Sequence, residues 1–260
     1  MSKTMNFIDI SGYQAGLDLE TVFAQNPIDG VIVKSTEGIG YVNRNCDPWV
    51  QWLIRNNKPW GFYHYLNSSD PVAEAKRFVR DTINYFHDGV PCADYEGQIV
   101  QSFGTYYLRR FLETVYAETG VKCLVYSNLS TIQGDVNGFR AIADDGYQLW
   151  LAQYANMSPT GFQPSPWQRG SFAPFDKITM HQYSSCGRLA GYSGDLDLDI
   201  FYGEVDDWNR LAGKASPEPE PAPEPTPDPK EDWLLDWIEY LEEEKTRIQA
   251  KIDELKARRV

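Results

Sequence analysis

The sequence predicts an α/β fold, an irregular TIM-like (β/α) barrel with fewer helices in its last part, followed by a C-terminal helical tail. Short apolar runs of strand length recur along residues 5–213, and there are about eight of them. Segments with helical spacing separate the earlier runs. Alternating strands and helices favour a parallel sheet, and about eight strands favour its closure into a barrel.

The expected strands are rich in β-branched and aromatic residues. In chain order they are MNFIDI (5–10), GVIVKST (30–36), WGFYHY (60–65), CADYE (92–96), KCLVYS (122–127), LWLAQY (149–154), ITMHQYS (178–184) and LDLDIF (196–201). The last of these follow one another with little helical sequence between them, so we expect the end of the barrel to be rich in strands.

Helical spacing is found in residues 46–57, 71–87 and 102–119. The second of these has the clearest start signal, because Ser69, Asp70 and Pro71 suit the first positions of a helix. In barrels of this kind the active site lies at the carboxyl ends of the strands.

The composition changes sharply near residue 215, and we expect three parts: a barrel in residues 1–213, a linker in 214–229 and a tail in 230–260. Residues 216–229 read SPEPEPAPEPTPDP, which predicts a stiff polyproline-II spacer. In the tail, positions four and three apart form a heptad seam: Leu234, Ile238, Leu241, Lys245, Ile248, Ile252 and Leu255. We favour an oligomerising coiled coil over an amphipathic helix that folds back on the body.

The bulk composition excludes several classes of protein. A hydrophobic content of 42% and an aromatic content of 14% indicate a globular protein with a core. The net charge of −13 disfavours nucleic acid as a partner. No apolar run is long enough to cross a membrane, and the start MSKTMNFIDISGYQ lacks the apolar run of a secretory signal. We therefore do not expect export through the secretory pathway.

Cysteine and histidine give little support to a metal or a cofactor. Cys46, Cys92, Cys123 and Cys186 are scattered without a CxxC pair, so we expect free, mostly buried thiols. The three histidines, at positions 64, 87 and 181, lack the spacing of metal ligands. The prediction is no metal and no cofactor.

Acidic residues recur where the expected strands end. Asp9, Glu37 and Asp197 belong to three of these strands, while Asp94 and Glu96 end a fourth. Residues i and i+2 of a strand face the same side, so Asp94 and Glu96 should point together into the barrel mouth. Two neighbouring carboxyls raise the pKa of one of them, which gives a proton donor beside an anion. Cleavage of a glycosidic bond uses that combination.

A single Asp near a strand end is more often a helix cap or a turn residue. Asp18, Asp29, Asp70 and Asp144 fit that ordinary role. Only the recurrence of acids at successive strand ends, beside tyrosine and tryptophan, favours a functional site.

The chain resembles the family 25 glycoside hydrolases, the Chalaropsis-type lysozymes of phage endolysins and bacterial autolysins. The matching segments stand in the family's order: FIDISGYQ (7–14), VIVKSTEG (31–38), GFYHY (61–65), DYE (94–96), VYSN (125–128), LWLAQY (149–154), HQYSS (181–185) and GDLDLDIF (194–201). The resemblance covers about residues 5–210. It implies cleavage of the β-1,4 bond between N-acetylmuramic acid and N-acetylglucosamine in bacterial peptidoglycan.

The resemblance also implies residue roles. Glu96 corresponds to the general acid, Asp94 to a partner that orients or stabilises the attacking group, and Asp9 and Asp197 to further catalytic acids of the cleft. The residues implied to bind substrate are Glu37, Tyr63, Tyr126, Trp150, Gln153, Tyr154 and Gln182. One departure is Asp199, where similar sequences often carry Asn; an extra acid there is expected to raise a neighbour's pKa.

Two mechanisms stay open at this point. Asp94 either attacks the anomeric carbon directly or stabilises attack by the substrate's own 2-acetamido oxygen, and we favour the second. The main alternative to a muramidase is a catalytically silent glycan-binding barrel assembled through residues 230–260. A third interpretation, a lysin attached to a virion through its tail, differs in partners and not in chemistry.

Overall fold

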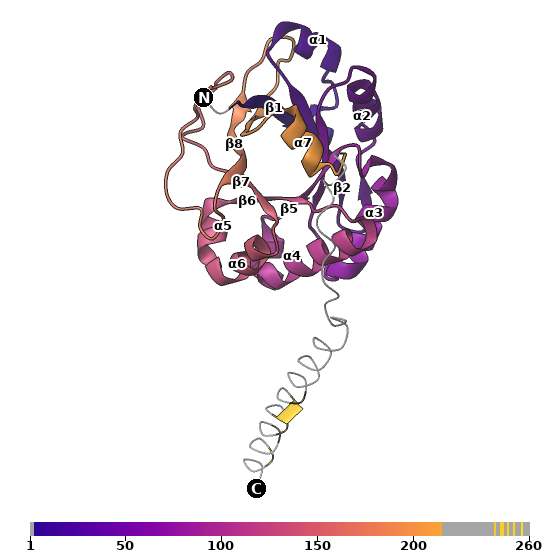
Figure 1. Cartoon of the computed structure of the whole chain (residues 1–260), viewed down its shortest axis with the longest axis vertical. Coiled ribbons are helices and arrows are strands. Elements are labelled where there is room, and N and C mark those ends of the chain that lie inside the picture. The colour runs from indigo at the N-terminus through magenta and orange to yellow at the C-terminus, as the bar shows by residue number, and fades with distance from the viewer. Residues whose placement is uncertain are drawn as a thin grey trace, which may run out of the picture. The chain divides into compact units, whose positions relative to one another are not determined.

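The computed structural model describes residues 3–214 and six residues of the tail, Glu242, Lys245, Thr246, Gln249, Ile252 and Lys256. The chain divides into two compact units, Met1–Ser216 and Pro217–Val260. Figure 1 shows the first of these as a ring of strands with helices along part of its outside.

Eight strands close the barrel. They are β1 (Met5–Ile10), β2 (Gly30–Glu37), β4 (Trp60–Tyr65), β5 (Val90–Asp94), β6 (Leu124–Asn128), β7 (Gln148–Ala152), β8 (Ile178–Gly187) and β9 (Leu196–Phe201). Neighbours pair in the order β1-β9-β8-β7-β6-β5-β4-β2, and β1 pairs with β2 to complete the ring. All pairs within the ring are parallel except β9 with β8 and with β1. The two-residue strand β3 (Tyr41–Val42) pairs antiparallel with the end of β2.

Helices cover the outside of the first part of the ring. They are α1 (Leu19–Gln25), α2 (Cys46–Arg55), α3 (Pro71–Thr82), α4 (Gln98–Thr119), α5 (Leu129–Gly134) and α6 (Val136–Asp144), with short 3-10 helices at Gly12–Gln14 and Ile83–Tyr85. Residues 153–177 and 188–195, all of them described, contain no helix. The predicted barrel with fewer helices in its last part is therefore confirmed.

The predicted helices agree with α2, α3 and α4 to within a few residues. Asp70 caps α3 by accepting hydrogen bonds from Val72 N at 2.9 Å and Ala73 N at 3.0 Å, and Pro71 follows it. The third helix begins earlier than predicted, at Gln98, because helical turns continue on both sides of a break at Gly104, where φ is 63°. A positive φ of this kind favours glycine.

Two of the four acids expected in helix caps or turns, Asp18 of α1 and Asp70 of α3, are helix N-caps. Asp29 instead accepts a hydrogen bond from Asn6 N of β1 at 2.7 Å. Asp144 is the last residue of α6, and the N-cap of that helix is Asp135. The four cysteines are free thiols, and three of them are buried.

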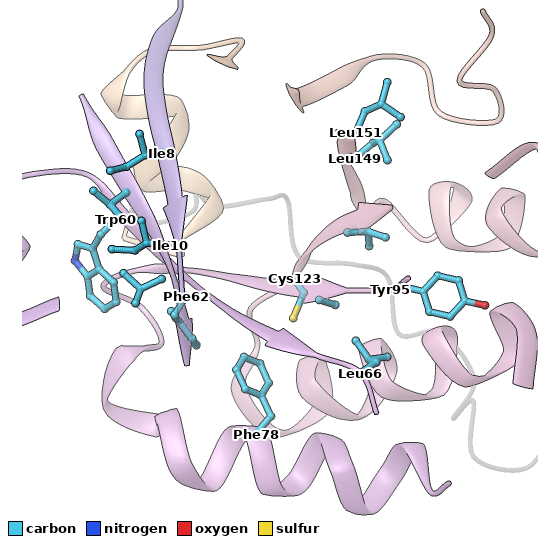
Figure 2. Packing of buried hydrophobic residues seen from close by; sticks show 14 of the residues in the cluster. Ile8, Ile10, Trp60, Phe62, Leu66, Phe78, Tyr95, Cys123, Leu149 and Leu151 are labelled. Carbon is cyan, nitrogen blue, oxygen red and sulfur yellow. The ribbon is translucent and has the colours of Figure 1, made fainter. Parts of the chain in front are cut away.

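Two apolar layers hold the barrel. Outward-facing strand residues such as Ile8, Ile10 and Phe62 form one layer with buried helix residues such as Phe78 of α3, as Figure 2 shows. Inward-facing residues form the second layer inside the ring. There Trp208 of α7 (Val205–Leu211) packs on Phe7 and Phe201, with ring centroids 4.4 and 5.1 Å apart. This helix closes the end of the barrel that lies opposite the carboxyl ends of the parallel strands.

The described residues of the tail are helical. Two of them, Lys245 and Ile252, belong to the predicted heptad seam, and Thr246 Oγ1 donates a hydrogen bond to Glu242 O at 2.8 Å. The other seam positions, and all of the predicted linker from residue 215 onward, lie outside the described residues. The coiled coil therefore stays a prediction.

Candidate active site

A cavity of about 230 Å³ opens at the carboxyl ends of the parallel strands. Its lining brings together four acids, three tyrosines, one tryptophan and one glutamine: Asp9, Asp94, Glu96, Asp197, Tyr63, Tyr126, Tyr154, Trp150 and Gln182. These are nine of the eleven site residues expected from the sequence. The side chains of Glu37 and Gln153 are not part of this lining.

The alternation of side chains along the strands explains this gathering. Asp94 is the last residue of β5, and Glu96 follows two residues later, outside the strand in which the sequence placed it. The chain nevertheless stays extended there, because Tyr95 N donates to Tyr126 O at 3.0 Å and Ser127 Oγ donates to Tyr95 O at 3.0 Å. Asp94 and Glu96 thus face the cavity while Tyr95 packs in the outer apolar layer.

Gly97 ends this extended segment. Its φ is 65°, a value that side chains other than glycine rarely adopt. A Cβ atom at this position would also lie 2.7 Å from the hydroxyl of Tyr65. The turn that follows Glu96 therefore depends on glycine for both conformation and space.

Asp94 and Glu96 interact strongly with each other. Burial raises the pKa of Asp94 well above its ordinary value, and the charge of Glu96 raises it further. Burial also raises the pKa of Glu96, whose side chain is less enclosed. Two carboxyls coupled in this way bind protons as a pair. The pair can therefore hold a proton donor and an anion side by side near neutral pH.

Lys34 is a cation close to this pair that the sequence analysis did not single out. Its side chain is mostly buried, and its charge lowers the pKa of both Asp94 and Glu96. The ammonium Nζ lies 2.6 Å from Glu37 Oε2 and 4.7 Å from the ring centroid of Tyr65. Strand alternation could have found it, because Lys34 stands two residues after the inward-facing Ile32 of β2.

Glu37 lies outside the cavity lining, but its carboxyl bonds to Lys34 and its charge raises the pKa of Asp94. Burial opposes ionisation of the Glu37 carboxyl, but the hydrogen bonds from Lys34 and Asn67, together with the charge of Lys34, favour it, and the pKa of Glu37 is lowered. The bond from Asn67 Nδ2 is 2.9 Å long. Glu37 is therefore an anion that orients the lysine, and its expected contact with substrate stays a prediction.

The opposite wall of the cavity carries Asp9 and Asp197, which are register partners on β1 and β9. Gln182 Nε2 donates to Asp9 Oδ2 at 2.6 Å. The amide oxygen of the same glutamine accepts hydrogen bonds from the hydroxyls of Tyr126, at 2.8 Å, and Tyr154. Burial, followed by the charge of Asp9, raises the pKa of Asp197 to about 9.

Gln153 has a different position from the one expected. Its side chain donates to Arg169 O at 2.6 Å and accepts from Arg169 N at 3.1 Å. It thereby fixes the long connection between β7 and β8, which borders the cavity wall formed by Tyr154. Its expected contact with substrate stays a prediction.

Two histidines, His64 and His181, are buried in the protein interior and contact polar groups there. His64 Nδ1 lies 2.7 Å from Thr36 Oγ1, and His64 Nε2 lies 3.1 Å from Glu74 Oε1. His181 Nε2 lies 2.8 Å from Gln153 O. Among the described residues, no group of three or more His, Cys, Asp or Glu side chains is arranged to hold a metal ion. The same part of the chain has no helix that is long and apolar enough to cross a membrane.

Comparison with known proteins places this site in a family. The profile of glycosyl hydrolases family 25 matches residues 8–192. The chain is 28% identical to the autolytic lysozyme of Clostridium acetobutylicum over 200 residues, which are 76% of this chain and 56% of that protein. It is also 28% identical to the lysozyme of Streptococcus phage Cp-1 over 192 residues, 68% of this chain and 54% of the phage protein. The chain thus spans about half the length of the curated relatives it matches.

Solved structures share the fold. The bacterial lysozyme of Streptomyces coelicolor superposes with a TM-score of 0.65 at 22% identity, covering 83% of this chain and 100% of that one. The muramidase of Acremonium alcalophilum gives a TM-score of 0.66 at 20% identity, covering 81% and 100%. The family profile extends over more than half of the chain and includes eight of the nine cavity residues. The chain therefore belongs to glycosyl hydrolases family 25.

Proposed function

We propose that this chain is an N-acetylmuramidase that hydrolyses the β-1,4 bond between N-acetylmuramic acid and N-acetylglucosamine in bacterial peptidoglycan. The observation that carries the proposal is the pair Asp94 and Glu96, which face one cavity and hold protons jointly. Aromatic rings and polar side chains of the kind that bind sugars surround this pair. The family and the lysozymes to which the chain is similar support the same reaction.

Glu96 is the proposed general acid. Its carboxyl stands beyond the end of β5, where it is more accessible than Asp94, and burial favours its protonated form. It would donate its proton to the glycosidic oxygen as the bond breaks. Asp94 is the proposed anion, because the cation of Lys34 favours its ionised form and protonation of Glu96 removes the largest charge that opposes ionisation.

The arrangement favours attack by the substrate's own 2-acetamido oxygen. Asp94 and Glu96 come from one extended segment and lie on the same wall of the cavity. A carboxylate on that wall is suited to stabilise the positive charge that develops on the acetamido nitrogen. Direct attack by Asp94 on the anomeric carbon is the alternative mechanism.

An endolysin is the proposed biological role, since a phage lysozyme is among the relatives. The protein would then act on the host cell wall after it leaves the cytoplasm. We also propose that residues 230–260 assemble the barrels, or dock them, through a helical seam.

Replacing Glu96 tests the reaction and its acid together. Glu96→Gln should lower the rate of peptidoglycan hydrolysis by about 10²- to 10⁴-fold, because the amide cannot donate a proton to the leaving group. The rate is measured as the loss of turbidity of Gram-positive cell walls. Glu118→Gln, at an exposed position of α4, is the matched control and should lyse like the wild type. Equal lysis by Glu96→Gln and the wild type would contradict the assignment of Glu96 as the acid, whereas no lysis by either protein would favour a glycan-binding barrel.

The pH profile tests the electrostatic role of Lys34. Removal of its charge in Lys34→Met raises the pKa of both Asp94 and Glu96, since the cation favours their ionised forms. The general acid must be protonated and the stabiliser ionised, so both limbs of the kcat/KM profile should move to higher pH, by about one unit. Glu37→Gln, which removes the ion pair but keeps the cation, should move the profile much less. An unmoved profile in Lys34→Met would contradict the role.

A modified substrate tests the mechanism. A glycan in which the 2-acetamido group next to the scissile bond is replaced by hydroxyl should be cut at least about 10²-fold more slowly, because the internal nucleophile is gone. The measurement is kcat on both oligosaccharides with the same enzyme. Equal kcat values would favour direct attack by Asp94.

Sedimentation tests the tail. The full-length chain should sediment as an oligomer, whereas a chain ending at residue 215 should sediment as a monomer, because the heptad seam would be absent. The truncated chain retains the barrel and should still lyse cell walls. The same mass per particle for both chains would rule out the oligomerising seam.

A further inference from the structure

Asp199 lies beneath the floor of the cavity, among the apolar residues inside the barrel. It stands two residues after Asp197 on β9, so both side chains face inward. Its register partners are Phe7 on β1 and Gln182 on β8. The side chain is fully buried and does not line the cavity. A buried carboxyl in such a place needs hydrogen-bond partners or a proton.

The hydrogen bonds around Asp199 leave one oxygen without a donor. Trp150 Nε1 donates to Asp199 Oδ1 at 2.8 Å. Asp199 Oδ2 is buried and receives no hydrogen bond from a nitrogen or hydroxyl group of the described residues. The carboxyl of Asp9 faces the same interior, because its register partner Asp197 stands two residues before Asp199, and Asp9 and Asp199 shift each other's pKa. A hydrogen bond between two carboxyl groups forms only when one of them carries a proton.

The surroundings make loss of that proton costly. The main charges that act on Asp9 and Asp199, besides each other, are those of the acids Asp197 and Glu96. The titratable groups that lie on the inner side of the barrel near the two carboxyls are Tyr63 (β4), Cys92 and Asp94 (β5), Glu96, Tyr126 (β6), Tyr154 and Asp197 (β9). None of these groups carries a positive charge, so none offsets the charge of a doubly ionised pair.

We propose that Asp199 is a positioning residue that shares one proton with Asp9 and thereby fixes Asp9 and Trp150 at the cavity. The proton lies between Asp199 Oδ2 and the carboxyl of Asp9. Gln182 Nε2 donates a hydrogen bond to Asp9 Oδ2, and Trp150 Nε1 donates one to Asp199 Oδ1. One buried side chain thus orients two groups that line the cavity.

Replacing Asp199 with asparagine keeps the size of the side chain and its two hydrogen bonds but removes the titratable proton. The amide of Asp199→Asn can donate to Asp9 and accept from Trp150 Nε1, and it does so at any pH. Valine at the same position fills a similar volume and can do neither. The pair of variants therefore tests whether the hydrogen bonds matter, and the pH tests whether a proton makes one of them.

The pH dependence of Tm tests for the shared proton, and this measurement needs no substrate. Burial and the neighbouring acids raise the pKa of Asp9 and of Asp199 above the unfolded value, so the stabilisation by the proton is complete at low pH and declines as pH rises. The Tm of Asp199→Asn should therefore increase relative to the wild type between pH 5 and 9, by about 2–4 °C. Asp144→Asn removes an equal charge from the exposed end of α6 and should give a difference that does not change with pH. A constant difference for Asp199→Asn would overturn the shared proton.

Enzymatic activity tests whether Asp199 positions Asp9 and Trp150, and this part of the inference rests on the proposed muramidase function. At neutral pH, Asp199→Asn should keep kcat/KM within about twofold of the wild type, whereas Asp199→Val should lose about 10- to 100-fold. Equal kcat/KM for the two variants would overturn the positioning role. If the wild type itself does not cleave peptidoglycan, the proposed function fails, while the pH dependence of Tm still decides the shared proton. The same measurement decides it if Asp199→Val does not fold.

Discussion

The parallel pairing of β1 with β2 closes the sheet, and closure directs every second side chain of eight strands into one narrow interior. The lower part of that interior is apolar and is closed by Trp208 of α7. The upper part holds the acids. Because apolar residues and neighbouring acids surround them there, these carboxyls are poorly solvated and their pKa values rise. The chemistry of the site therefore follows from the closed ring and not from any single loop.

The two walls of the cavity differ in the groups that contact their acidic side chains. The wall formed by β5 lies close to Lys34, whose cation favours ionised Asp94. The wall formed by β1 and β9 lacks such a cation among the described groups that act on it, and there an amide and tyrosine hydroxyls make the polar contacts. With a pKa of about 9, Asp197 is protonated at neutral pH. It can then donate a hydrogen bond into the cavity, while Asp94, the proposed anion, lies on the opposite wall.

The sequence was sufficient for the barrel and for most of the cavity, because alternation and strand ends are local properties. It could not show that Gln153 bonds to Arg169, sixteen residues away in an irregular connection. The contact between Asp9 and Asp199 was equally hidden, since it depends on the antiparallel pairing of the first strand with the last. The sequence also extended β5 through Glu96, whereas the strand ends at Asp94 and the extended course continues only because Tyr95 bonds to β6.

Burial of the acids has opposite consequences for stability and for chemistry. A carboxyl with a raised pKa makes the folded state less stable at neutral pH than a solvated carboxyl would. The same rise favours the protonated forms of Glu96, the proposed general acid, and of Asp197. The apolar layers under the helices and around Trp208 contain many large, fully buried rings, and burial of such rings strongly favours folding. A barrel with so heavy an aromatic core can tolerate several poorly solvated carboxyls at one end, which is the condition that acid catalysis at this site requires.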